Sequence, residues 1–234
     1  MDIKIPYTPR KHQAHLHKQI DKHRWNVLVC HRRFGKTVCM INHLIRSALL
    51  SKLKNPRFAY IAPTFKQAKS IAWDYMKQFT AKIPHTKFNE TELRVDLPNG
   101  ARITLLGSES PDGLRGIYLD GCVIDEYANV NSKLFPEIIR PALSDRKGYC
   151  VFIGTPMGMN NNFYELYQHA QGAEDWFNYK AKASDTKIVD NDELVKAKEV
   201  MGEKKYMQEF ECDWIANIEG AVYGDVIAKL DDDK

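Results

Sequence analysis

The 234-residue sequence has few of the features that mark membrane, secreted or metal-binding proteins. No stretch approaches the roughly 20 apolar residues of a membrane-spanning helix, and the first residues, MDIKIPYTPRKHQ, lack the apolar core of a signal peptide. The five cysteines are scattered, with none of the paired spacings of a zinc site. We therefore expect reduced, buried thiols, a location in a cytoplasm and no membrane partner.

Acidic residues are scarce in the first quarter of the chain. Residues 1–60 carry 13 Lys and Arg residues against two acidic ones, whereas the remainder carries 21 against 28. Such a basic segment attracts polyanions, either nucleic acid or the phosphates of a nucleotide. A merely solvated basic surface is the alternative, because no aromatic-rich nucleic-acid motif accompanies the charges. The spacing of His12, His15 and His17 fits no standard metal site.

Apolar, β-rich runs recur along the chain with helical patterns between them. The runs occupy residues 25–30, 57–63, 121–126 and 149–156. Alternating strands and helices predict a mostly parallel sheet that is covered by helices on both faces. Residues 93–107 read as two strands joined at Asn99-Gly100, a hairpin signal that makes the sheet mixed. The predicted fold class is therefore α/β.

The pattern changes after Pro156. A helix over 162–171 and a strand over 176–183 precede a charged helical stretch with a break near Gly202. We predict a core domain over residues 1–180 and a small helical lid subdomain over 181–225. Residues 226–234 have no packing pattern and read as the start of a linker.

The segment CHRRFGKTVC, residues 30–39, lies where a strand turns into a helix. Gly35, Lys36 and Thr37 fit the end of the phosphate-binding pattern G-x-x-x-x-G-K-[ST], the Walker A motif, although Cys30 occupies the position of its first glycine. Backbone N–H groups at a helix N-terminus, a lysine and a hydroxyl that can reach Mg²⁺ form a phosphate cradle.

A second strand, in GCVIDEYANV, ends in two carboxylates. Asp125 is placed like the Walker B acid that holds Mg²⁺ together with Thr37, and Glu126 is placed to orient and deprotonate water. By itself the pair could be an ordinary acidic turn. Together with Lys36 and Thr37, in this β-α order, it predicts a P-loop ATPase that uses ATP and Mg²⁺.

Two further segments complete the expected site. In VFIGTP, a buried strand ends at Thr155, whose hydroxyl can sense the γ-phosphate. In YTPRKHQ, Gln13 can bond the edge of adenine and Tyr7 can stack on its ring. Each segment alone could be merely structural.

In combination these segments resemble the ATPase domain of the large terminase subunit, the DNA-packaging motor of tailed bacteriophages. The likeness runs from about Pro9 to Gly224 and rests on HRRFGKT, YIAPTFKQAKSIAWD, GLRG ahead of VIDE, FIGTP and YMQEFECDW. The resemblance implies a RecA-like, additional-strand ATPase fold. It also implies a homo-oligomeric ring on the portal protein of a procapsid in the host cytoplasm, with double-stranded DNA and the small terminase subunit as partners.

The resemblance also implies roles for two arginines, Arg32 and Arg115, near the nucleotide. Arg32, four residues before the loop lysine, would contact the phosphates or couple them to the lid, while Arg33 and Phe34 complete the nucleotide loop without an assigned role. Arg115 precedes the strand that ends in Asp125 and is poorly placed to reach its own phosphate loop. At the matching GLRG position, the resemblance implies a finger that enters the neighbouring subunit's site. A turn arginine on the surface is the alternative.

Large terminases carry a nuclease domain that this sequence does not contain, so we expect no DNA cutting by this chain. A superfamily 2 helicase is a rival interpretation, but the stretch after Pro156 is too short for the second RecA-like domain that a helicase needs. A non-hydrolysing nucleic-acid-binding or assembly module is the other rival. The presence of Glu126 beside Asp125 argues against it.

Overall fold

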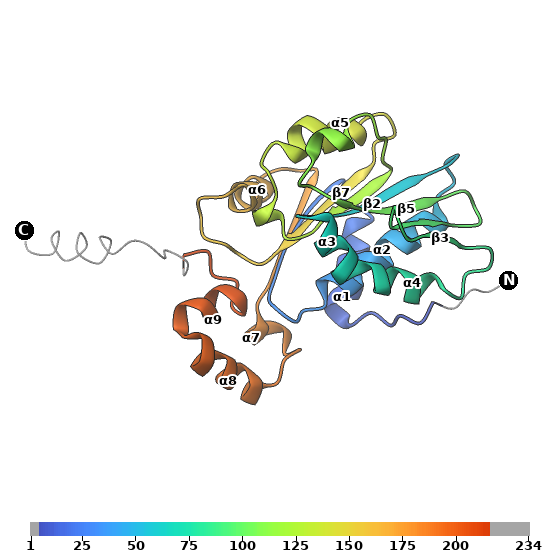
Figure 1. The fold of residues 1–234 in the computed structure, drawn as a ribbon. Helices are drawn as coiled ribbons and strands as arrows, with labels where there is room; N and C mark the ends of the chain where they lie inside the picture. Colours follow the sequence, from blue (N-terminus) through green and yellow to red (C-terminus); the bar gives the residue numbers. More distant parts are fainter. Residues whose placement is uncertain (1–4, 216–234) are drawn as a thin grey trace, which may run out of the picture.

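The computed structural model describes residues 5–215, apart from the side chain of Asp112. One sheet of eight strands lies at the centre of this region, in the order β3-β4-β5-β2-β6-β7-β1-β8, with helices on both faces (Figure 1). The strands are β1 (Trp25–Cys30), β2 (Arg57–Ala62), β3 (Lys87–Asn89), β4 (Arg94–Asp96), β5 (Arg102–Gly107), β6 (Gly121–Ile124), β7 (Tyr149–Gly154) and β8 (Trp176–Ala181).

Helices connect these strands. The main ones are α1 (Lys11–Ile20), α2 (Lys36–Leu50), α3 (Phe65–Ala68), α4 (Asp74–Thr80), α5 (Arg140–Ala142), α6 (Asn162–Ala170), α7 (Ala183–Thr186), α8 (Asn191–Met201) and α9 (Glu203–Glu209). Shorter 3-10 or π-helical segments are η1 (Lys69–Trp73), η2 (Pro111–Leu114), η3 (Tyr127–Asn129) and η4 (Phe135–Ile139). None of the helices within residues 5–215 is long and apolar enough to cross a membrane.

The central strands are the apolar runs of the sequence. β1, β6 and β7 are almost wholly buried because helices cover both of their faces, as expected of parallel strands. β4 alone runs antiparallel to its neighbours β3 and β5, and the hairpin turns at the predicted Asn99-Gly100. The predicted mixed, mostly parallel sheet is therefore confirmed, and β3 is an additional short strand at its edge.

Each face of the sheet carries its own hydrophobic core. One core lies beneath α1, α2 and α4 and contains Trp73, Phe34 and Leu44. The other lies beneath α5 and α6 and contains Phe152 and Phe163. All five cysteines are free and buried, as the sequence predicted.

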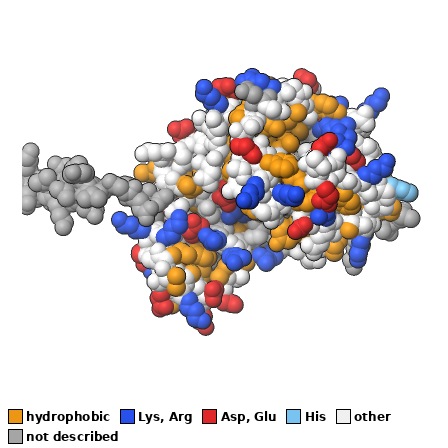
Figure 2. Space-filling model, in the orientation of Figure 1, with side chains coloured by type: hydrophobic (Ala, Val, Ile, Leu, Met, Phe, Trp, Pro, Cys, Tyr) orange, Lys and Arg blue, Asp and Glu red, His pale blue; other side chains and the backbone are white. Residues whose placement is uncertain are grey.

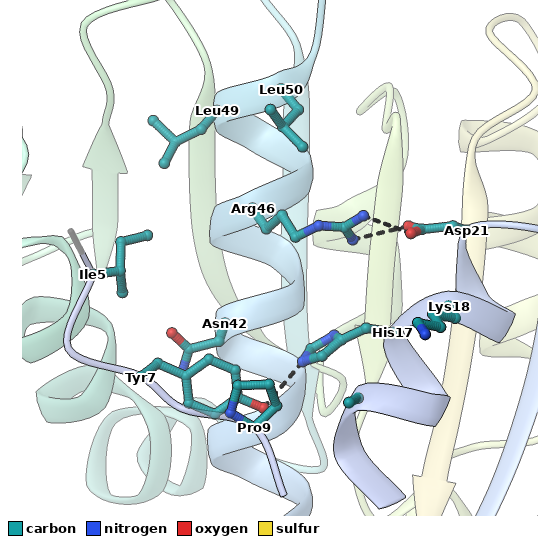
Figure 3. A pocket seen from close by; sticks show the side chains of 11 residues that line it. Ile5, Tyr7, Pro9, His17, Lys18, Asp21, Asn42, Arg46, Leu49 and Leu50 are labelled. Carbon is teal, nitrogen blue, oxygen red and sulfur yellow. Dashed lines mark hydrogen bonds and ion pairs between the residues drawn. The ribbon is translucent and has the colours of Figure 1, made fainter. Parts of the chain in front are cut away.

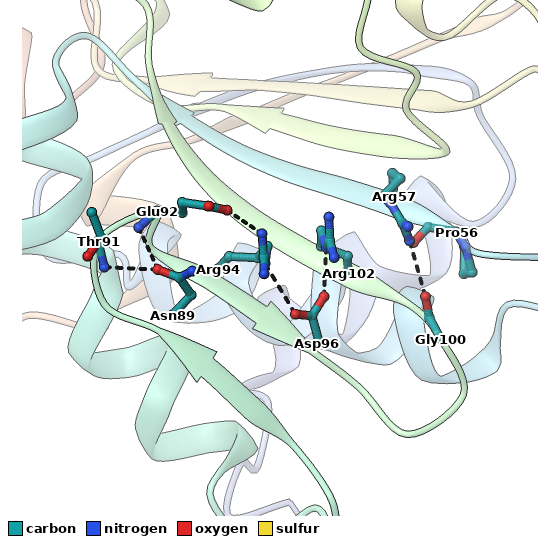
Figure 4. A network of polar contacts seen from close by, with 9 residues as sticks. All are labelled: Pro56, Arg57, Asn89, Thr91, Glu92, Arg94, Asp96, Gly100 and Arg102. Atoms are coloured by element: carbon teal, nitrogen blue, oxygen red, sulfur yellow. Dashed lines mark hydrogen bonds and ion pairs between the residues drawn. The ribbon is translucent and has the colours of Figure 1, made fainter.

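The β3–β4–β5 extension carries a row of ion pairs on one face (Figure 4). Asp96 lies between two arginines, with Arg94 Nε 3.1 Å and Arg102 Nε 2.6 Å from its carboxylate oxygens. Arg57 Nη1 donates to the carbonyl of Gly100 at 3.1 Å. These cationic side chains therefore have partners within the extension. Part of the positive charge of the protein thus stabilises the sheet.

Helices α7, α8 and α9 form a separate cluster, which we call the lid (residues 183–210), at the lower left of Figure 1. Its hydrophobic centre consists of Ala183, Leu194 and Phe210 with a few half-buried neighbours. Gly202, at φ 77°, separates α8 from α9 at the predicted break. The domain boundaries remain predictions, and residues 216–225 of the predicted subdomain and the predicted linker, 226–234, lie outside the described residues.

Candidate nucleotide-binding site

The segment between β1 and α2 forms a tight loop at the carboxyl end of the sheet. Gly35 adopts φ 87°, a conformation that favours glycine, and precedes the first residue of α2. A Cβ at this position would lie 3.0 Å from Gln13 Nε2, so a side chain here would be crowded as well as strained. No side chain caps the N-terminus of this 15-residue helix and its first turn holds no acid, which leaves N–H groups for an anion.

Lys36 is held at the mouth of this loop. Its Nζ donates hydrogen bonds to the carbonyls of Cys30 at 3.0 Å and His31 at 3.3 Å. Cys30, which replaces the usual first glycine, is the buried last residue of β1. The loop therefore presents an ammonium group beside the uncapped helix N-terminus.

Asp125 and Glu126 follow β6 at the same edge of the sheet. The backbone N–H of Asp125 continues the β2–β6 ladder by donating to Ile61, so its position is fixed by the sheet. Glu126 has φ 45° and ψ 50°, a left-handed conformation that costs a non-glycine residue about 1–3 kcal/mol. Such strain is concentrated at functional sites.

Burial dominates the electrostatics of the two acids. It raises the pKa of Asp125. It also raises the pKa of Glu126, and the negative charge of Asp125 raises it further. The nearby Lys36 ammonium opposes both shifts and favours the ionised carboxylates. The site thus holds a basic Glu126 carboxylate beside a cation, as a general base requires.

Tyr60 connects the loop helix to the carboxylates and was not identified from the sequence. It is fully buried in β2, and its hydroxyl donates a hydrogen bond to Asp125 Oδ2. The side chain of Thr37 lies near the same hydroxyl group and lowers the pKa of Tyr60 against the effect of burial. The hydroxyl of a tyrosine in an otherwise apolar, buried strand needs polar partners. This pattern is the signal in the sequence from which Tyr60 could have been identified.

Thr155 lies at the end of β7, the neighbour of β6. Its side chain is buried, and its backbone lies near the Glu126 carboxylate, where it lowers the pKa of Glu126 against the effect of burial. A Cβ on Gly154 would lie 3.6 Å from the Cα of Glu126, so the two strand ends are in close contact. The structure thus brings Thr155 to the catalytic candidate Glu126.

The two loop arginines and the phenylalanine differ in their surroundings. The Arg32 backbone N–H donates to the carbonyl of Glu209 at 2.8 Å, and its Nη1 lies 3.9 Å from the Glu209 carboxylate. Arg33 is exposed and has φ 69°. Phe34 is buried, with its ring 5.6 Å from that of His31, so only its backbone faces the loop.

Arg32 thus connects the phosphate loop to the lid. Glu209 also pairs with Lys205 at 3.2 Å, so one carboxylate lies between two cations. In Figure 2, Lys and Arg side chains lie on both sides of the boundary between the lid, at lower left, and the sheet domain. This boundary is therefore suited to phosphate groups.

The two adenine candidates occupy different places. Gln13 is buried, accepts from the Arg10 N–H at 3.0 Å and donates to the Gly35 carbonyl at 3.2 Å. Tyr7 instead bonds His17 Nε2 at 3.0 Å and lines a cavity of about 520 Å³ along α2 (Figure 3). Arg10, not singled out from the sequence, donates to the Phe34 carbonyl at 3.2 Å and joins Gln13 at the loop.

The three N-terminal histidines also separate. His17 stacks on His43 of α2 with 5.3 Å between ring centroids, and this pair lies between α1 and α2. His12 Nδ1 lies 2.6 Å from the Tyr179 hydroxyl, and the His15 ring is also near Tyr179. Two of the three thus pack against the edge strand β8.

Arg115 follows η2 in the connection between β5 and β6. Its side chain is 58% exposed, and its Nη2 lies 3.9 Å from the carboxylate of Glu137 in η4. With Tyr118 and Pro141 it lines a shallow pocket on the α5 side of the sheet. Its action on a neighbouring subunit remains a prediction.

Comparison with known proteins identifies the family. Residues 31–224 match the model of the N-terminal region of terminase large subunits of the T4-like virus type. The chain belongs to this terminase family. The large terminase subunit of Thermus virus P23-45 is 30% identical over 126 residues, which cover 46% of this chain and 26% of the relative. The chain thus spans about a quarter of the length of the curated relatives it matches.

Solved structures of large terminases share the fold. The ATPase domain of the Thermus phage P74-26 large terminase has a TM-score of 0.76 at 21% identity, covering 90% of this chain and 96% of that domain. The large terminase of a thermophilic bacteriophage in complex with ADP also has a TM-score of 0.76, at 16% identity, covering 88% of this chain and 53% of that protein. The fold of this terminase chain is therefore that of a large terminase ATPase domain.

Proposed function

We propose that this terminase chain hydrolyses ATP to drive double-stranded viral DNA into a procapsid. The observation that supports it best is the meeting of Lys36 and Thr37, at the start of α2, with Asp125 and Glu126, at the end of β6, through Tyr60. This is the arrangement that phosphoryl transfer to water requires: a phosphate cradle, oxygen ligands and a base.

The oxygen set fits Mg²⁺, which prefers carboxylate and hydroxyl oxygens and is usually held by few protein ligands plus phosphates. Asp125 and Thr37 would hold it, and the bound ion supplies charge neutralisation at the β- and γ-phosphate oxygens. Lys36 binds the same phosphates from the loop. Its hydrogen-bond partners within residues 5–215 are two backbone carbonyls, which phosphate oxygens can replace.

Glu126 acts as the general base in this proposal. Its carboxylate takes a proton from water while the water oxygen bonds to the γ-phosphorus. The bond from that phosphorus to the β–γ bridging oxygen breaks, and ADP and inorganic phosphate are formed. Thr155, whose backbone lies near the same carboxylate, senses the γ-phosphate.

The loop contacts also suggest how adenine is bound and how the lid takes part in hydrolysis. Gln13, with Arg10 beside it, is placed at the loop where the adenine edge would lie, and Tyr7 is the stacking candidate. Arg32, which already touches Glu209 of the lid, couples the phosphates to α9. Arg33 is exposed next to Arg32, and we assign it no role.

We further propose that the motor works as a homo-oligomeric ring on the portal protein, with the small terminase subunit, in the host cytoplasm. The ADP and ATP-γ-S complexes of a related large terminase support nucleotide binding at this fold. Exposed Lys11 and Lys18 of α1, with Lys22 in the turn that follows it, offer a basic surface for the DNA backbone. Binding there would weaken with salt and show little sequence preference.

Phosphate release by this chain, measured with and without DNA over a range of protein concentrations, tests the proposal. We expect turnover per subunit to rise with concentration, because the site is completed in trans. Lys36→Ala should weaken Mg·ATP binding itself, since it removes a charge from the β- and γ-phosphates. ATP binding without any turnover in the wild type would favour the non-hydrolysing assembly module.

The trans role of Arg115 has its own test. Arg115→Ala should abolish turnover and spare ATP binding, with an effect of about 10³ to 10⁵ in rate if it stabilises charge on the transferring phosphoryl group. A Glu126→Gln subunit keeps the finger, and an Arg115→Ala subunit keeps the base. Mixing the two should restore part of the activity. A co-assembled mixture without activity would exclude action in trans.

A further inference from the structure

The last turn of α9 contacts both loops that flank the candidate nucleotide site. Gln208 Nε2 donates to the carbonyl of Pro156 at 2.6 Å, and Pro156 directly follows Thr155. The next residue, Glu209, accepts the Arg32 backbone N–H at 2.8 Å. One helical turn of the lid is therefore bonded to the phosphate loop and, separately, to the turn after β7.

Gln208 is the buried side chain of a helix that is otherwise exposed or half-buried. Only 2% of the residue is accessible, and both ends of its amide are bonded, since Oε1 accepts from Lys205 Nζ at 3.3 Å. A buried amide costs stability unless its hydrogen bonds are made, so this residue type needs the Pro156 carbonyl. An apolar residue of similar size would suffice if packing alone were required.

The turn that Gln208 holds lies directly against Glu126. Gly154 approaches the backbone of Glu126, and the backbone of Thr155 lies near the Glu126 carboxylate. All four residues of β6 are paired with β7. A shift of the Pro156 carbonyl would therefore move the turn relative to Glu126. The lid would follow any shift of the Thr155–Pro156 turn, because the hydrophobic centre of the lid is small.

We infer that Gln208 is a positioning residue that couples the Thr155–Pro156 turn to the lid. This inference rests on the proposed ATPase function. Gln208 keeps the turn in place against Glu126 during hydrolysis and transmits movement of the turn to α9 when the γ-phosphate is lost. It touches no substrate atom. This connection is separate from the contact between Arg32 and Glu209, because it arises from a different loop and a different side chain.

The test compares Gln208→Leu with Ser184→Ala. The leucine keeps the bulk and the burial but removes the donor to Pro156. Ser184→Ala is the matched control, because it removes a bond between the lid and the residue that directly follows it, from Ser184 Oγ to Glu211 at 2.6 Å, that does not reach the nucleotide edge. For each protein, kcat and KM for ATP are measured, and amide hydrogen exchange of α8 and α9 is recorded with ATP-γ-S and with ADP.

We expect Gln208→Leu to lower kcat about tenfold, the effect of one lost hydrogen bond, with KM changed less than about twofold. The difference in exchange between ATP-γ-S and ADP, present in the wild type, should disappear in this variant and persist in Ser184→Ala. A third variant, Gln208→Glu, should be as slow as Gln208→Leu at neutral pH, because an ionised carboxylate cannot donate to the carbonyl.

Two outcomes would overturn the inference. If the wild type turns over ATP and Gln208→Leu keeps both kcat and the nucleotide-dependent exchange, the residue is merely structural and the proposed function stands. If both variants lose kcat and the exchange difference equally, the effect belongs to lid stability and not to the Pro156 contact. A wild type without turnover contradicts the proposed function itself, and the inference with it.

Discussion

The sheet domain and the lid are stabilised in different ways. In the sheet domain, large side chains such as Phe152, Phe163 and Trp73 are buried in two extensive cores. In the lid, the fully buried hydrophobic side chains are Ala183, Leu194 and Phe210. At about 1.5–3 kcal/mol for a large buried side chain, this small centre offsets little of the 1–2 kcal/mol that ordering each residue costs.

The lid therefore depends on polar contacts with the sheet domain. Besides the bonds of Gln208 and Glu209, His31 Nε2 lies 2.8 Å from the Thr186 hydroxyl. These contacts meet at the two nucleotide-facing loops. A segment with few apolar contacts responds to small changes where it is attached, which suits it to follow the state of the nucleotide.

The largest stability effect should come from the sheet domain. Phe152→Ala removes a buried ring that packs on Phe135 and Tyr127 at 4.7 and 4.9 Å between centroids. We expect the free energy of unfolding to fall by about 3–5 kcal/mol, because the cavity cannot collapse within a paired strand. Chemical denaturation measures it. A loss below 1 kcal/mol would show that this core is far more adaptable than its packing indicates.

The corresponding change in the lid should be local. Phe210→Ala removes the ring that stacks on Tyr206 at 5.4 Å in the lid centre. We expect global unfolding to change by less than about 1 kcal/mol, while amide exchange in α8 and α9 accelerates, because the lid opens without the sheet domain. If Phe210→Ala and Phe152→Ala destabilised global unfolding equally, the two regions would form one cooperative unit.

Mild acid should loosen the sheet domain. Burial is the main cause that lowers the pKa of His17 to about 4 and that of His43 to about 3, against about 6.5 in the unfolded chain. Because the unfolded state binds these protons first, stability is full above pH 6.5 and falls below it, by up to about 1.4 kcal/mol per pH unit for each histidine. The sequence places no histidine in residues 183–210.

Denaturation at pH 6.5 and 5.0 tests this expectation, since carboxylates titrate mainly below that window. His43→Leu should make the decrease in stability shallower, because one buried titrating ring is gone while His17 and the buried His31, whose pKa is also lowered by burial, remain. An unchanged slope in this variant would contradict the account.

Local signals in the sequence were sufficient for much of the fold. β1, β2, β6 and β7 are largely apolar, β-rich runs, and Asn99-Gly100 marks the hairpin, so these elements were predicted. The meeting of Lys36, Thr37 and the two acids followed from their places at strand and helix ends. β3 was missed because three half-exposed residues, KFN, at a sheet edge carry no pattern.

The contacts that join distant segments could not be predicted. Tyr60 reaches Asp125, and Gln208 reaches Pro156, only because the sheet order and the lid bring them together. Tyr7 lines a cavity along α2 that Gln13 does not line, and its stacking on adenine stays a prediction. Side-chain partners of this kind depend on tertiary packing, which single-sequence periodicity does not encode.

The central claim is that Glu126 activates water at a site where Lys36 and Asp125 hold Mg·ATP. The most direct test measures Mg·ATP affinity and single-turnover phosphate release for Glu126→Gln beside the wild type under assembling conditions. We predict nearly unchanged affinity and release that is slower by about 10² to 10⁴-fold, because only the general base is removed. Hydrolysis by Glu126→Gln at the wild-type rate would contradict the account.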